Sequence, residues 1–130
     1  MCSAKRILLC VDDELLILNA LRRSLRKEPY ELLCAQSAAD ALKVLEENEV
    51  GVVLTDYRMP EMNGIELIEY IKKHYPHTVT VLLSGYADPD KLTFAGHGDG
   101  YIFKPWDDEK LRDEVLRFFE QADKLKSAAT

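Results

Sequence analysis

Two spacings of hydrophobic residues alternate along the chain. Continuous apolar runs of a few residues, rich in Val, Ile, Leu and Cys, are typical of strands that are covered on both faces of a sheet. These runs cover residues 6–11, 30–34, 50–55, 78–83 and 101–103. Apolar residues at a spacing of three or four predict helices that each bury one stripe. These helices are expected at residues 14–27, 38–47, 64–75 and 107–125.

The segment between the last two predicted strands follows the helical spacing least well. Residues 88–95 have a composition that allows a short helix, but three glycines follow within residues 96–100. A glycine inside a helix costs about 1 kcal/mol relative to alanine. We therefore expect a short or frayed fourth helix in this segment.

Strands that alternate with helices in this way predict a doubly wound α/β fold of the (βα)5 type. The strands would form one parallel sheet, joined by right-handed crossovers, with helices on both faces. Ligands of such sheets bind beyond the carboxyl ends of the strands. Polar residues stand at the ends of four predicted strands, and they are Asp12, Asp13, Asp56, Ser84 and Lys104. We expect these side chains to meet at one edge of the sheet.

Three carboxylates that meet in one small site repel one another. At an effective dielectric constant near 20, two like charges 4 Å apart cost about 4 kcal/mol. Either one acid stays protonated or a cation neutralises the group, and Mg²⁺ suits hard oxygen ligands. In such a site Asp56 would attack a phosphoryl group as a nucleophile. Lys104 and the metal would neutralise the oxygens of that group.

Each of these residues also has a simpler structural interpretation. Asp12 and Asp13 alone would be acids that favour the start of the following helix. Ser84 alone is typical of a turn, and Lys104 alone of a solvated surface. Because these residues stand at strand ends that match the position of Asp56, we favour one shared site.

Composition and charge narrow the range of functions. A chain of 130 residues suits one domain, and a net charge of −6 argues against a broad phosphate-binding surface. No apolar run approaches the length of a membrane span, and the first residues do not follow the pattern of a signal peptide. We expect a disordered start at residues 1–4, one domain at 5–125, and a tail or the start of a linker at 126–130.

The three cysteines, Cys2, Cys10 and Cys34, are odd in number and widely spaced. Cys10 and Cys34 lie inside apolar runs. We therefore expect two small reduced core residues and one exposed thiol, and no metal site built from them. Reduced thiols of this kind favour a cytoplasmic location.

Four motifs together resemble the receiver domain of two-component response regulators. They are Val-Asp-Asp-Glu at 11–14, Asp-Tyr-Arg-Met-Pro-Glu-Met-Asn-Gly at 56–64, Leu-Ser-Gly-Tyr-Ala-Asp at 83–88 and Phe-Lys-Pro-Trp-Asp at 103–107. The resemblance extends over residues 5–121 and implies a flavodoxin-like sheet with strand order 2-1-3-4-5. It also implies a signalling switch rather than an enzyme with a separate substrate. Such a switch transfers a phosphoryl group only to itself, and later hydrolyses it.

The resemblance implies a role for each residue of the acidic site. Asp56 is the expected phosphoacceptor, charged from a phosphohistidine on a sensor histidine kinase. Asp13, Asp56 and the backbone carbonyl of Arg58 are expected to bind Mg²⁺ directly. Asp12 is expected to act on the metal through water.

The resemblance also implies a conformational switch next to this site. A new dianionic group would draw Ser84 and Lys104 inward, and the ring of Tyr101 would fill the vacated space. The alternative is that Tyr101 is an ordinary aromatic residue at the edge of the sheet. The expected output face consists of the fourth helix, the fifth strand and the fifth helix, and it would also support a homodimer. No direct binding of nucleic acid or membrane is expected of this domain.

Two features differ from the usual pattern of the family. The segment from Ser84 to Lys104 is slightly short and rich in glycine, and we expect high mobility there that falls on phosphorylation. Arg58 and Tyr86 are bulky residues two places after Asp56 and Ser84. We expect them to flank the acyl phosphate and to slow its hydrolysis.

Two other functions would use a similar fold. Phosphatases that form an aspartyl phosphate resemble one another in a second Asp two residues after the nucleophile, where this chain has Arg58. A nucleotide- or flavin-binding module would need a glycine-rich phosphate loop, where this chain has acids at residues 12–14. The output is left open, because the motifs at 84–88 and 104–107 resemble receivers joined to transcription activators, cyclic-dinucleotide phosphodiesterases or kinases.

Overall fold

The computed structural model describes residues 6–59, 61–85 and 99–128. Its strands form one parallel sheet in the order β2-β1-β3-β4-β5. The strands are β1 (Ile7–Val11), β2 (Glu31–Ala35), β3 (Val52–Asp56), β4 (Val79–Gly85) and β5 (Gly100–Lys104). The helices are α1 (Leu15–Leu25), α2 (Ala38–Glu47), α3 (Gly64–His74) and α5 (Asp108–Ala128). The predicted doubly wound α/β fold and its strand order are confirmed.

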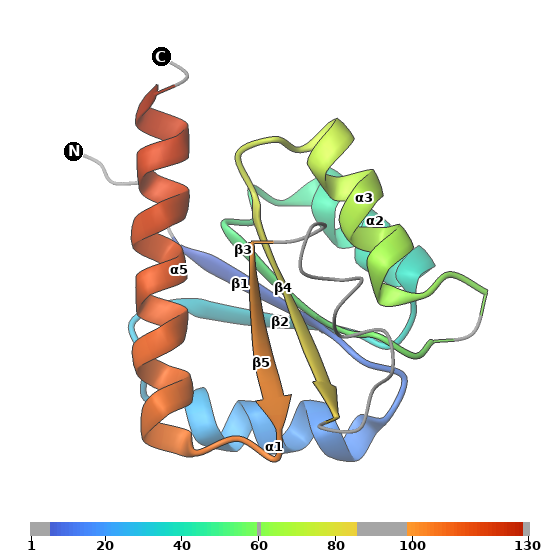
Figure 1. Cartoon of the computed structure of the whole chain (residues 1–130), viewed down its shortest axis with the longest axis vertical. Coiled ribbons are helices and arrows are strands. Elements are labelled where there is room, and N and C mark those ends of the chain that lie inside the picture. Colours follow the sequence, from blue (N-terminus) through green and yellow to red (C-terminus); the bar gives the residue numbers. More distant parts are fainter. Residues whose placement is uncertain (1–5, 60, 86–98, 129–130) are drawn as a thin grey trace.

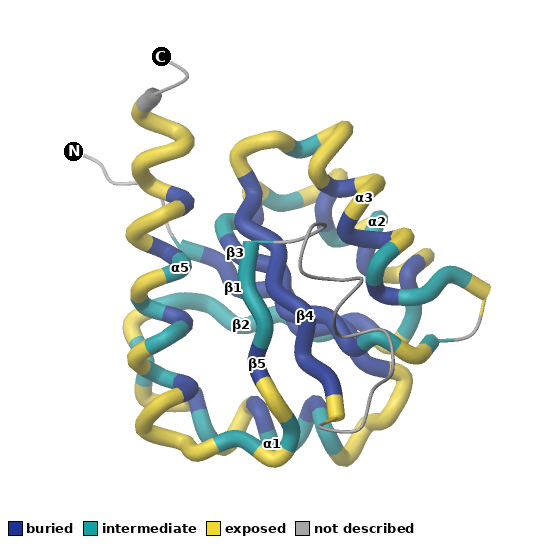
Figure 2. The backbone as a smooth tube through the Cα atoms, viewed as in Figure 1, coloured by how far each residue is buried: buried dark blue, intermediate teal, exposed yellow. Residues whose placement is uncertain are grey.

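Helices cover both faces of the sheet, with α1 and α5 on one face and α2 and α3 on the other (Figure 1). The central strands β1 and β3 are buried along their whole length (Figure 2). Because a strand covered on both faces needs apolar side chains in both directions, its residues form a continuous run rather than an alternating one. The apolar runs in the sequence reflect this double coverage.

Local signals set the starts of α2 and α3. The hydroxyl of Ser37 accepts the backbone N–H of Asp40 at 3.1 Å, as expected of an N-cap. At α3, Asn63 and Glu66 form a reciprocal capping box with distances of 2.9 and 3.0 Å. This box holds the start of α3 against the loop that leaves β3.

Four strands, β2, β3, β4 and β5, run past the ends that the sequence predicted. The parallel ladder pairs Asp56 with Leu83, Ser84 with Phe103 and Gly85 with Lys104. Backbone pairing therefore continues through the polar residues, so Ser84 and Lys104 lie inside strands rather than after them. At the ends of β3 and β5 the apolar run stops before the ladder because Asp56 and Lys104 contact each other instead of the core.

The last helix also runs further than predicted. It was expected to end at residue 125, but α5 continues to Ala128, so residues 126–128 are helical rather than part of a tail. The predicted start at 1–4 and the predicted fourth helix at 88–95 lie outside the described residues.

Candidate functional site

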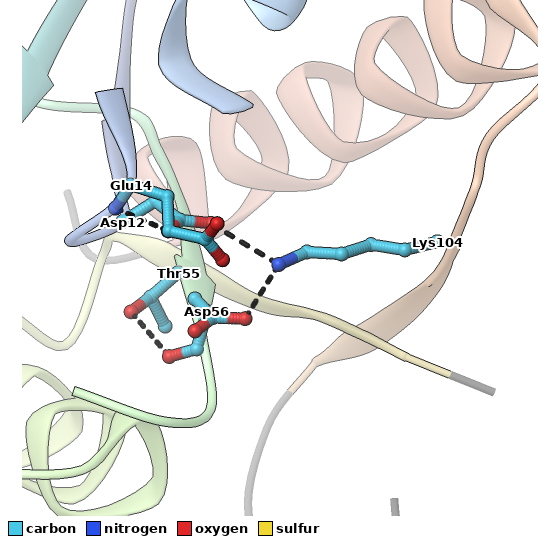
Figure 3. A network of polar contacts seen from close by, with 5 residues as sticks. All are labelled: Asp12, Glu14, Thr55, Asp56 and Lys104. Atoms are coloured by element: carbon cyan, nitrogen blue, oxygen red, sulfur yellow. Dashed lines mark hydrogen bonds and ion pairs between the residues drawn. The ribbon is translucent and has the colours of Figure 1, made fainter. Parts of the chain in front are cut away.

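The carboxyl ends of β1, β3 and β5 bring three acids and one lysine together. Asp12 follows β1 and Asp56 ends β3, and both are buried, whereas Asp13 is exposed. Carboxylate oxygens of the three acids lie within 4.8 Å of one another. Lys104, the last residue of β5, places its Nζ 2.7 Å from Oδ1 of Asp56 and 3.2 Å from Oδ2 of Asp12 (Figure 3). Residues that are far apart in the sequence thus form one polar cluster.

Burial and charge act against each other in this cluster. Burial raises the pKa of Asp12, and the charge of Asp56 adds to the rise, although the backbone N–H of Glu14 and the amine of Lys104 oppose it. Burial by itself would lower the pKa of Lys104. Hydrogen bonds and charges from Asp56 and Asp12 outweigh burial and raise that pKa. The lysine therefore stays protonated at neutral pH, while the ionised form of Asp12 remains costly.

Asp12 is held from two sides. Its Oδ1 accepts the N–H of Glu14, the N-cap residue of α1, at 2.9 Å. Its own N–H donates to the carbonyl of Ala35 at the end of β2, at 3.1 Å. The helix-start interpretation of Asp12 is therefore correct as well, because one carboxylate oxygen serves the helix and the other meets Lys104.

The loop after Asp56 depends on a close approach at Gly64. The N–H of Gly64 donates to the carbonyl of Tyr57 at 2.8 Å. A Cβ atom at Gly64 would lie 2.3 Å from the carbonyl oxygen of Asp56, which no real side chain tolerates. Within this loop Glu61 has a φ of 72°, an uncommon value for a residue other than glycine. The motif in the sequence predicted the loop, but not the close approach of Gly64 to the backbone of Asp56.

An open pocket of about 420 Å³ lies beside the acids. It is lined by Asp13, Tyr57, Arg58, Met59 and Asn63. Asp13 belongs both to this pocket and to the acidic cluster, so the cluster is reached from solvent on this side.

Ser84 lies on β4, the strand next to β3, and Tyr101 lies on β5, the edge strand beyond β4. Ser84 is 3% exposed and directly follows Leu83, the register partner of Asp56. Tyr101 is half-buried, and its ring packs against the small cluster of Ile68 and Leu82. The part of Ser84 in the site stays a prediction. Tyr86, the other predicted flanking residue, lies outside the described part of the chain.

A hydrogen bond from Trp106 connects the loop after β5 to the end of α1. Its indole N–H donates to the hydroxyl of Ser24 at 3.0 Å, and that hydroxyl donates to the carboxylate of Asp108 at 2.6 Å. The intervening Lys104–Pro105 peptide bond is cis. Sequence analysis gave no signal for the contact with Ser24, because the two residues are far apart along the chain.

The fold and this site define a doubly wound α/β domain with an acidic cluster and a lysine at its carboxyl edge. Residues 8–116 match the family model of the response regulator receiver domain. The chain therefore belongs to the response regulator receiver domain family.

Relatives and solved structures agree with this assignment. The chain is 36% identical over 116 residues to the hydrogenase transcriptional regulatory protein HoxA of Bradyrhizobium diazoefficiens, with 87% of this chain and 24% of that protein covered. It is 34% identical to HoxA of Cupriavidus necator, with 92% of this chain and 25% of that protein covered. The signal receiver domain of an HD domain-containing protein from Pseudomonas fluorescens superposes with a TM-score of 0.90 and 30% identity, covering 98% of this chain and 96% of that chain.

The chain spans about a quarter of the length of these curated relatives, at 24% and 25%. Among the described helices, none combines the length and the hydrophobicity that a transmembrane segment requires.

Proposed function

We propose that this domain is a phosphoacceptor switch in which Asp56 receives a phosphoryl group from the phosphohistidine of a sensor histidine kinase. The observation that carries the proposal is the position of Lys104, whose amine bridges Asp56 and Asp12. A lysine placed there can stabilise negative charge on the acceptor oxygen and on the oxygens of an incoming phosphoryl group. Membership of the receiver domain family supports the same conclusion.

The residues present suit a divalent cation. Hard oxygen donors from Asp13, Asp56 and the backbone carbonyl of Arg58 would hold Mg²⁺ directly, and Asp12 would act through water. The clustering of the three carboxylates supports this set. Burial and the charge of Asp56 raise the pKa of Asp12, so a bound cation would stabilise its ionised form. When bound, Mg²⁺ supplies the charge that lets an anionic donor approach an anionic acceptor.

In the transfer step, a carboxylate oxygen of Asp56 attacks the phosphorus atom. The N–P bond of the phosphohistidine breaks, and the imidazole leaves with the electron pair. The amine of Lys104 then pairs with the negatively charged phosphoryl oxygens, and the hydroxyl of Ser84 donates a hydrogen bond to one of them. Hydrolysis of the acyl phosphate later restores Asp56, and the bulky Arg58 and Tyr86 slow the approach of water.

The conformational output follows from the same groups. Movement of Ser84 toward the phosphoryl group vacates space near β4, and the ring of Tyr101 moves into it. In the present structure that ring packs on Ile68 and Leu82 and lies 4.6 Å from the ring of Phe103. The change would reach partners, including a second copy of the chain, through β5 and α5; the expected fourth helix of this output face lies outside the described residues.

The kinase would dock beside the phosphoacceptor, on the start of α1. Leu15 and Leu16 are 51% and 79% exposed and follow the acidic motif directly. Exposed apolar side chains next to a reactive site favour a protein partner. A phosphohistidine on a cytoplasmic kinase would place this domain in the cytoplasm, and the net charge of −6 gives no reason to expect nucleic acid on it.

The test is phosphorylation by Mg²⁺ and a small acyl phosphate, followed by intact mass. We expect a mass gain of one phosphoryl group that requires Mg²⁺. The gain should disappear in Asp56→Asn and persist in Asp113→Asn, a matched change of an exposed acid on α5. The proposal would be refuted by phosphorylation of Asp56→Asn to the same extent as the unchanged chain. The fluorescence of Trp106, the one tryptophan of the chain, gives an independent reading of metal binding.

A further inference from the structure

Two free thiols face each other across the strands β1 and β2. The parallel register pairs Cys10 directly with Cys34, and both are free. Their side chains lie on the same face of the sheet, because Cys10 belongs to the core cluster under α1 and α5 and Cys34 packs against that cluster. Neighbouring strands lie about 4.8 Å apart, and disulfides join Cα atoms that are roughly 4.4–6.8 Å apart. A bond between the two sulfurs is therefore within reach of the folded chain.

We propose that Cys10 and Cys34 form a reversible disulfide, a modification site that couples oxidation to the phosphorylation site. The sequence alone indicated two unrelated core residues, and only the register of β1 and β2 brings them together. Disulfides in reducing compartments are usually transient and serve redox sensing or catalysis. A pair next to a signalling site suits the sensing role.

The two thiols are not equivalent. Cys34 is half-buried and reachable from solvent, whereas Cys10 is fully buried. Burial raises the pKa of Cys34, and the guanidinium group of Arg22 opposes that rise through its charge and a side-chain hydrogen bond. Cys34 is therefore the thiol that meets an oxidant first, and Cys10 is the resolving thiol.

The reaction uses hydrogen peroxide as the oxidant. The thiolate of Cys34 attacks one peroxide oxygen, the O–O bond breaks, and a sulfenic acid forms with the release of hydroxide. Cys10 then attacks the sulfur of Cys34, the S–O bond breaks, and a second hydroxide leaves. With the two thiol protons, the products are one disulfide and two waters. The two sulfurs are oxidised by two electrons in total, and the peroxide is reduced by the same two.

The disulfide would act on the metal site through Asp12. The N–H of Asp12 donates to the carbonyl of Ala35. Ala35 is the residue after Cys34 on β2, and Asp12 follows the end of β1, two residues after Cys10. Disulfides most often hold Cα atoms about 5.5–6 Å apart, whereas neighbouring strands lie about 4.8 Å apart. The cross-link therefore strains the pairing of β1 and β2 next to the hydrogen bond that holds Asp12. Disturbing such outer support typically weakens metal affinity by about tenfold or more.

The experiment starts from the Cys2→Ser chain, which leaves only the paired thiols, and treats it with hydrogen peroxide. We expect an intact mass lower by two hydrogen atoms, and a tryptic species that joins peptide 7–22 to peptide 28–43. A dithiol reductant should reverse both changes. The matched control carries Cys34→Ser in addition and should form no cross-link.

The effect on the site rests on the proposed function and is measured separately. We expect the oxidised chain to need about tenfold more Mg²⁺ for half-maximal phosphorylation by a small acyl phosphate, with no change in the peroxide-treated control. Normal phosphorylation of the reduced chain tests the proposed function on its own. The disulfide is overturned if both cysteines remain alkylatable after peroxide, or if they cross-link only in urea that unfolds the chain. A cross-link that leaves the Mg²⁺ requirement unchanged overturns the coupling.

Discussion

Replacing Asp12 by asparagine should stabilise the metal-free domain while weakening its metal site. The side chain of Asp12 is fully buried, and burying an ion costs several kcal/mol before its contacts are counted. Asparagine keeps an oxygen acceptor for the N–H of Glu14, which is 2.9 Å away, and removes the charge. The substitution therefore isolates the electrostatic cost of the site from its geometry.

The magnitude follows from the contacts of the carboxylate. Repulsion between acids whose oxygens lie within 4.8 Å is worth about 3 kcal/mol at an effective dielectric constant of 20. The amine of Lys104, 3.2 Å away, offsets about 5 kcal/mol at the same dielectric constant. Because the pKa of Asp12 is still raised, burial and repulsion together exceed the favourable contacts. We expect Asp12→Asn to be about 1–2 kcal/mol more stable than the unchanged chain at neutral pH without metal.

The raised pKa of Asp12 also determines how the stability gained by Asp12→Asn changes with pH. The folded-state pKa of Asp12 lies above its usual value of 3.8, so the protonated acid costs nothing at pH values below 3.8. The cost grows as the pH rises from 3.8 toward the folded-state pKa, and it is complete above that pKa. The advantage of Asp12→Asn should therefore be small near pH 4 and largest near pH 7.

Urea unfolding at several pH values, with a chelator and then with millimolar Mg²⁺, measures this effect. Mg²⁺ should stabilise the unchanged chain more than Asp12→Asn, because it binds the intact site more tightly. Asp113→Asn, on the exposed face of α5, should change stability by less than about 0.5 kcal/mol. A metal-free Asp12→Asn chain that is less stable than the unchanged one at pH 7 would show that the carboxylate is favourably paired and the reasoning wrong.

Three further substitutions test the loop after Asp56 and the contacts at the start of β4. Gly64→Ala should cost about 1–3 kcal/mol and slow phosphorylation, because its Cβ would lie 2.3 Å from the carbonyl oxygen of Asp56; unfolding and phosphorylation rates that both match the unchanged chain would contradict this. Asp99→Ala should cost about 1–3 kcal/mol in urea unfolding, because its carboxylate accepts hydrogen bonds from the N–H and the hydroxyl of buried Thr80 at 2.9 and 3.1 Å. Lys72→Ala should cost less than about 1 kcal/mol, because its ion pair with Asp99 is 43% exposed on the lysine side. Equal losses in the last two variants would rule out the difference that we assign to burial.

The fold was predictable because its signals are local. Each strand of a doubly covered parallel sheet must be apolar on both sides, so residues 6–11 and 50–55 stand out as continuous runs. The start of α3 also had a local signal, since Asn63 and Glu66 have the spacing of a capping box. Strand ends were less predictable, because the ladder continues through Ser84 and Lys104 after the apolar run has stopped.

The sequence predicted which residues meet at the site, but not how their side chains are arranged. Parallel strands must bring their carboxyl ends to one edge, and this is why Asp12, Asp56 and Lys104 were expected together. Neither the burial of Asp12 nor the placement of the amine between two carboxylates follows from any local pattern. The close approach of Gly64 to the Asp56 backbone likewise needs the folded loop.

The sequence by itself determined the alternation of strands and helices, the polar residues at the strand ends, and the resemblance to receiver domains. Tertiary structure alone decided which distant atoms touch. The physical reason is that apolar periodicity is read within a few neighbouring residues, whereas register is set by pairing between strands that are far apart along the chain. Cys10 and Cys34 illustrate the difference, because their places in apolar runs were visible in the sequence and their direct pairing was not.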